Sequence, residues 1–132
     1  MSLDFRLGVW RSEIPLSNGA AAKQYAALSE GPEDPVGFDS AVYAFHSQLT
    51  DLYPRLDMLP ESDEERSPWG SSPEFSGVYV SIALRPTHYA EVFPMILRIA
   101  EVNGLVCFDP QNVKVHLPSC LEGKGKDRRA RE

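Results

Sequence analysis

The side chains that could do chemistry in this chain are dispersed and form no recognisable motif. The histidines His46, His88 and His116 fall on different expected elements, and neither His-x3-His nor Cys-x2-Cys spacing is present to bind zinc. The sequence also has no Gly-x-Ser-x-Gly turn for a serine nucleophile and no glycine loop for a nucleotide phosphate. We therefore expect no catalytic residues, no metal and no cofactor.

An acidic segment followed by a tryptophan is the first candidate for a binding site. Residues 57–76 have no periodic apolar pattern, so we expect a loop of about 20 residues, a length that is often functional. Trp69 in this loop either folds back over the edge of the core or anchors a partner, because Trp is enriched at the energetic centres of interfaces. The predicted partner-binding residues are Asp63, Glu64, Glu65 and Trp69.

A second candidate surface combines cations and aromatic rings on the expected strands. If helices cover the aliphatic side of the sheet, its other side presents Arg6, Trp10, Tyr79, Arg85, Lys114 and His116. Such a face could bind an anionic ligand or serve a small enzyme. The simpler interpretation is a hydrated polar face, which antiparallel sheets commonly leave in water.

The charge distribution bears on the kind of partner. Residues 122–132 hold five Lys or Arg and three Asp or Glu, a net charge of +2. Because the whole chain has a net charge of −6, the other 121 residues have a net charge of −8. An acidic body disfavours the phosphate backbone of nucleic acids and attracts cations. We expect a basic protein partner and no nucleic acid.

Cysteine usage and hydropathy indicate the compartment. Cys107 and Cys120 are too few for a disulfide framework. Residues 1–11 lack the apolar run of a signal peptide, and no stretch approaches the ~20 apolar residues of a membrane span. We expect a cytoplasmic protein without a membrane segment, and nothing in the sequence indicates its oligomeric state.

Hydrophobic periodicity predicts the elements. Strict alternation predicts half-buried strands over residues 3–10 and 78–85, and two shorter strands over 105–108 and 113–117 form a hairpin. Apolar stripes at helical spacing predict helices over about 17–28, 39–53 and 87–103, the last capped by Thr87 and interrupted by Pro94.

These elements predict an α+β fold in the order strand, helix, helix, strand, helix, strand, strand. We expect a two-layer sandwich, in which a four-stranded sheet carries three helices on one face. Residues 1–118 form one domain, and residues 119–132 form a charged, disordered tail.

Several segments together resemble a family of small uncharacterised bacterial proteins. They are Leu7–Trp10, Ser67–Trp69, Val78–Leu84 and, most specifically, the Gly-Leu-Val-Cys-Phe-Asp-Pro-Gln run at 104–111. The resemblance spans roughly residues 3–118 and implies one domain, but it supplies no chemistry because that family has no established activity. Small acidic α+β immunity proteins offer an analogy at the level of fold only. We predict a non-enzymatic protein-binding domain, immunity-like or regulatory, with a small enzyme or anion binder as the alternative.

Overall fold

The computed structural model describes residues 4–29 and 37–121, which form a sheet, three α-helices and three short 3₁₀ helices. The strands are β1 (Phe5–Trp10), β2 (Trp69–Phe75), β3 (Tyr79–Leu84), β4 (Val106–Asp109) and β5 (Lys114–His116). The helices are α1 (Asn18–Ser29), α2 (Ser40–Leu52), α3 (Tyr89–Val102), η1 (Leu56–Met58), η2 (Glu61–Arg66) and η3 (Pro86–His88).

The sheet has the strand order β2-β3-β1-β4-β5, and every neighbouring pair is antiparallel. The α+β class is confirmed, but the described sheet has five strands where four were expected. The additional strand is β2, which lies within the segment expected to be a loop. Gly70, Ser71, Ser72 and Pro73 give this strand a poor β signal, and Pro is tolerated there because β2 lies at the sheet edge.

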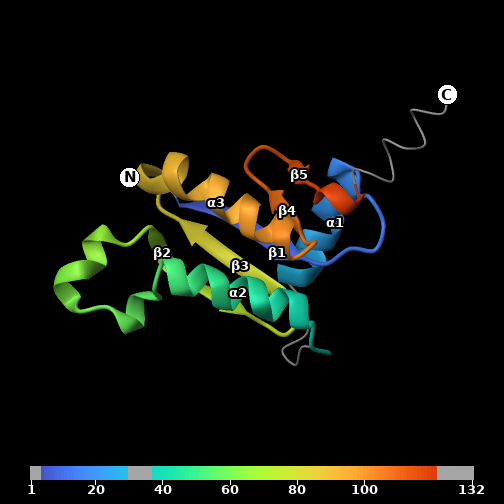
Figure 1. Cartoon of the computed structure of the whole chain (residues 1–132). Coiled ribbons are helices and arrows are strands. Elements are labelled where there is room, and N and C mark those ends of the chain that lie inside the picture. The colour runs from blue at the N-terminus through green and yellow to red at the C-terminus, as the bar shows by residue number, and fades with distance from the viewer. Residues whose placement is uncertain (1–3, 30–36, 122–132) are drawn as a thin grey trace.

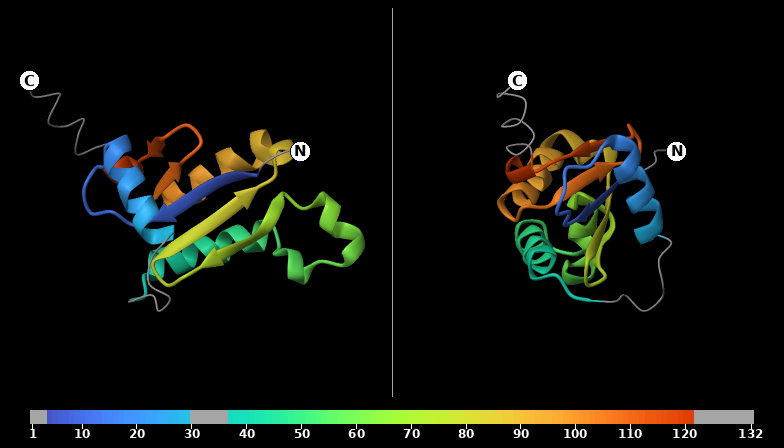
Figure 2. Two further views of the ribbon diagram at one scale, coloured as in Figure 1. Left: turned by 180° about the vertical axis from the view of Figure 1, so that it is seen from behind. Right: turned by 90° about the vertical axis from the view of Figure 1, so that its right-hand side faces the viewer.

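Helices cover both faces of the sheet, which corrects the expected two-layer arrangement. Figure 1 shows α2 and α3 in front of the strands and α1 behind them, and the turned views of Figure 2 agree. The physical reason is that the strands are apolar on both sides. Beneath α2 and α3 the core includes Leu7, Val9, Phe45, Ile82 and Ile96, and beneath α1 a second core includes Trp10, Ala21, Tyr79, Val106 and Phe108.

Capping residues set the starts of α1 and α2. The Asp39 carboxylate accepts hydrogen bonds from the backbone N–H groups of Ala41 and Val42, at 2.9 and 3.2 Å. The Ser17 hydroxyl accepts from the N–H of Ala20 in the same way, at 3.1 Å. In contrast, α3 begins at Tyr89, after a 3₁₀ turn that contains the predicted cap Thr87.

The C-terminal boundary of the packed region lies beyond Pro118. Leu121 is buried in the core beneath α1, so the first residues of the expected tail belong to the folded part. Residues 122–132, on which the rest of that expectation falls, lie outside the described residues.

Gly8 allows α1 to approach the centre of the sheet. A Cβ at this position would lie 2.7 Å from Cδ1 of Tyr25 and 3.0 Å from Cε1 of Tyr79. Both distances are shorter than ordinary van der Waals contact, so any side chain here would push α1 away from the strands.

We expect Gly8→Ala to lower the free energy of unfolding by about 1–3 kcal/mol, because overpacking strains the core beneath α1. Gly19→Ala is the matched control: no heavy atom lies within 4 Å of its Cβ, and alanine in helix α1 should add up to about 1 kcal/mol. Urea unfolding of both variants measures the difference. Equal effects of the two substitutions would show that α1 does not pack closely on β1.

Candidate functional site

An acidic arm projects from the body of the molecule between α2 and β2. This arm, residues 55–66, contains η1 and η2 and extends beyond the end of the sheet (Figure 1). It carries five carboxylates and two guanidinium groups, a balance of −3. Of the predicted binding residues, Glu64 and Glu65 are exposed and Asp63 is partly exposed. The arm therefore presents negative charge to solvent.

Arg85 holds the end of the arm against the sheet. Its Nη1 donates to the carbonyl oxygens of Glu64, Ser67 and Glu65, at 2.9, 3.1 and 3.3 Å. These acceptors belong to the main chain, so the contacts leave the carboxylates available. Within residues 4–29 and 37–121, Glu61, Asp63, Glu64 and Glu65 use no side-chain oxygen in a hydrogen bond. Arg85, predicted as a ligand residue, instead shapes the predicted partner surface.

Trp69 lies beneath the arm and not on its surface, which corrects its prediction as a partner contact. Its exposed fraction is 0%, and its Nε1 donates to the carbonyl oxygen of Tyr53 at 2.9 Å. Its ring packs edge-on against the Tyr53 ring, with centroids 6.1 Å apart. Because the Trp69 ring is packed and its N–H is hydrogen-bonded within the protein, Trp69 anchors the base of the arm. The other interpretation, that Trp69 folds back onto the core, agrees with this position.

An apolar hollow of about 310 Å³ lies where the arm joins α2. Its lining includes Leu52, Tyr53, Pro54 and Leu59, with Asp63 and Arg66 as charged members. Leu52, the last residue of α2, is 55% exposed at this hollow. Met58 on the arm is 75% exposed.

We expect Arg85→Ala to loosen the arm, because three carbonyl oxygens lose a charged donor. Cleavage by a glutamate-specific protease at Glu61–Glu65 should become several-fold faster, with a loss of about 1–2 kcal/mol in the free energy of unfolding. Arg98→Ala, at an exposed position of α3, is the control and should change neither measurement. Unchanged cleavage in Arg85→Ala would mean that Arg85 does not hold the arm.

The structure does not bring the predicted cationic face together. Arg6, Trp10 and Tyr79 share the face toward α1, but Trp10 and Tyr79 are only 3% and 5% exposed there. The Trp10 Nε1 is occupied by the side-chain oxygen of Gln24 at 2.8 Å. His116 lies on the opposite face, beside Phe93 of α3, with ring centroids 5.4 Å apart. The expected hydrated face is wrong around Trp10 because α1 covers it.

The Tyr79 hydroxyl is buried, and no described residue meets it with full hydrogen-bond geometry, although the hydroxyls of Ser81 and Tyr25 lie near enough to affect its pKa. Burial, followed by the charge of Tyr25, raises the pKa of Tyr79 to about 12, so the phenol is neutral at physiological pH. A buried hydroxyl with no partner weakens the fold, since the unfolded chain hydrates it.

We therefore expect Tyr79→Phe to raise the free energy of unfolding by about 1 kcal/mol, by removing an unsatisfied polar group while retaining the ring. Tyr43→Phe, at a 51% exposed ring, should leave stability unchanged. Thermal and urea unfolding of the two variants decide the matter. A destabilised Tyr79→Phe protein would indicate that the hydroxyl has a partner.

Thiols, imidazoles and carboxylates do not assemble into a metal centre in the part of the chain that the structure describes. His88 Nδ1 lies 3.9 Å from a carboxylate oxygen of Glu91, one turn away along the chain. Cys107 is fully buried, and burial raises the pKa of its thiol, which keeps it protonated and unreactive. Cys120 is exposed.

The run at residues 104–111 has a structural role. Gly104 has a φ of +69° where α3 ends, and Leu105–Phe108 are buried. The buried Asp109 carboxylate accepts from the N–H groups of Gln111 and Asn112, at 2.9 and 3.3 Å, which shapes the β4–β5 turn. The Gln111 side chain then donates to the carbonyl oxygen of Arg6 at 2.8 Å and accepts from its N–H, joining the turn to β1.

Comparisons with known proteins add no relative. No family model matches the chain, and neither curated proteins nor solved structures give a match. Among the described helices, none has the length and apolar character needed to cross a membrane. The likeness of residues 104–111 to a bacterial family stays a resemblance, and the function is argued from geometry.

Proposed function

We propose that this chain is a protein-binding domain that docks a basic segment of a partner against its acidic arm. The proposal rests on the position of the acidic arm directly beside an apolar hollow. A charged arm with a balance of −3 borders an apolar hollow of about 310 Å³. A regulatory or immunity-like role, in which binding inhibits the partner, fits such a surface.

The carboxylates of the arm supply steering and orientation. Glu61, Glu64 and Glu65 are exposed and project from a body that is itself acidic, so their fields add and attract a cationic surface. Charges at the rim of an interface mainly raise the association rate and make it dependent on salt. Arg66 lines the hollow and repels any partner that places a cation there, so it restricts the partners that can bind.

The hollow supplies the apolar part of the interface. Leu52, Tyr53 and Leu59 line a concavity into which one aliphatic or aromatic side chain of a partner can insert. Buried anchors of this kind carry most of the energy of protein interfaces. The partner segment therefore pairs an apolar side chain with flanking Lys or Arg.

The arm is also preorganised for binding. Arg85 fixes its C-terminal end and Trp69 fixes its base, while the N–H of Leu56 donates to the Ser72 hydroxyl at 2.9 Å. A surface that is ordered before it binds loses less conformational entropy in the complex.

Site-specific crosslinking followed by charge reversal tests the proposal. A photoreactive residue replaces Ser62 on the arm, and a second protein carries it at Lys23 on α1 as the control; both positions are exposed. A protein crosslinked only from position 62 is purified, and its affinity is measured at low and high salt for the wild type and for Asp63→Lys combined with Glu64→Lys.

The double reversal should weaken binding about tenfold or more, and salt should weaken the wild-type complex. Glu13→Lys combined with Glu74→Lys makes the same change in net charge away from the arm and should weaken binding less than about twofold. Equal losses in the two double variants, or an affinity that is insensitive to salt, would reject the arm as the docking surface.

A further inference from the structure

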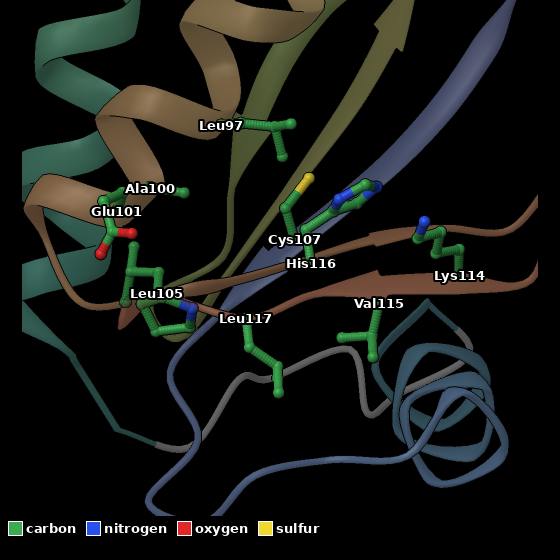
Figure 3. Close-up of a pocket in the computed structure, with 10 residues that line it drawn as sticks. Leu97, Ala100, Glu101, Leu105, Cys107, Lys114, Val115, His116 and Leu117 are labelled. Carbon is green, nitrogen blue, oxygen red and sulfur yellow. The ribbon is translucent and has the colours of Figure 1, made fainter. Parts of the chain in front are cut away.

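A second hollow, of about 380 Å³, lies between the C-terminal half of α3 and the β4–β5 hairpin. Its apolar lining includes Leu97, Leu105, Cys107 and Leu117 (Figure 3). Its volume is at the lower end of the range of pockets that hold small organic ligands. The hollow is separate from the acidic arm and is lined by different residues.

Two nitrogen-bearing side chains border this apolar surface. Lys114 and His116 lie two residues apart on β5, so both project from the face that carries α3. In the register of the hairpin, His116 is opposite Cys107. The Lys114 side chain is exposed and forms no ion pair with any residue of the described ranges.

The nearby carboxylates are held by donors of their own. Glu101 accepts from the N–H of Ser119 at 2.7 and 3.0 Å and from its hydroxyl at 2.9 Å. Figure 3 shows Glu101 and Lys114 at opposite ends of the hollow. Asp109 is occupied by the donors of Gln111 and Asn112 in the hairpin turn. The positive charge of Lys114 therefore remains available.

His116 contributes a neutral donor. Burial, followed by the charge of Lys114, lowers the pKa of the imidazole, while Asp109 opposes the shift. The Phe93 ring of α3 packs edge-to-face against the His116 ring. The Cys107 thiol, which lies opposite His116 in the hairpin, is uncharged. One ammonium and one neutral imidazole match a ligand with a single negative charge.

We propose that this hollow binds a small aliphatic carboxylate, whose alkyl chain lies on Leu97, Leu105 and Leu117 and whose carboxylate meets Lys114 and His116. Leu97 and Leu117 are only partly buried, so an alkyl chain of the ligand removes their remaining apolar surface from water. Lys114 and one ring N–H of His116 supply charge-assisted hydrogen bonds to the carboxylate. The inference is independent of the arm and does not rest on the function proposed for it.

Octanoate is the probe, and its binding is followed by NMR on the isotope-labelled full chain. Titration should shift the signals of Leu97, Leu105 and His116, with an affinity about tenfold higher than that of octanol, which lacks the charge. Butanoate, which retains the carboxylate but has an alkyl chain shorter by four carbons, should bind at least about tenfold more weakly than octanoate. The pKa of His116 should rise when octanoate is bound, because a bound carboxylate stabilises the imidazolium.

Lys114→Glu reverses the positive charge that Lys114 brings to this hollow, and the position is exposed, so folding should be preserved. It should remove the preference for octanoate over octanol, whereas Lys23→Glu on α1, with the same charge change, should leave that preference intact. Absence of shifts at Leu97 and Leu105 with millimolar octanoate would overturn the proposal. Equal binding of octanol and octanoate would also overturn it, by showing an apolar hollow without anion recognition.

Discussion

The whole arrangement depends on β1 being apolar on both of its faces. Leu7 and Val9 are buried beneath α2 and α3, while Trp10 is buried on the opposite side beneath α1. A central strand of this kind is stable only when both faces are removed from water, because each buried aliphatic or aromatic side chain contributes a few kcal/mol of transfer free energy. The two cores therefore form around one strand, and Gly8 at its middle lets α1 come close enough to complete the second core.

That constraint also explains where the two candidate binding surfaces lie. With both faces of the sheet largely covered, a partner or ligand finds no broad open sheet surface around β1. Two of the hollows lie at the margins, one where the acidic arm leaves α2 and one where the β4–β5 hairpin meets α3, and a third of about 310 Å³ lies between Trp10 and α1. The arm is tied to the body through Trp69 and Arg85, so its orientation is coupled to the packing of the sheet it extends from.

The sequence predicts the periodic elements well and their assembly less well. Alternation around Leu7 and Val80 and the hairpin after Phe108 are both present, because local spacing depends on near neighbours. The face of the sheet on which α1 packs could not be predicted from local spacing. It depends on the burial of Trp10 and Tyr79, which lie on the same face of neighbouring strands. The strand at Trp69–Phe75 was missed because its pairing with β3, and not its own composition, makes it a strand. For the same reason the sequence left open whether Trp69 folds back onto the core or contacts a partner, and the structure buries it.

The two edges of the sheet limit the way in which this molecule can be recognised. At β2, Pro73 offers no amide hydrogen, its carbonyl oxygen lies 3.2 Å from Nε2 of His46, and two irregularities interrupt the register with β3. At the other edge β5 is only three residues long. Both margins are therefore poor templates for an incoming strand, which disfavours extension of the sheet through backbone pairing. The same features favour association through side chains and disfavour fibrillar self-assembly that starts from these edges.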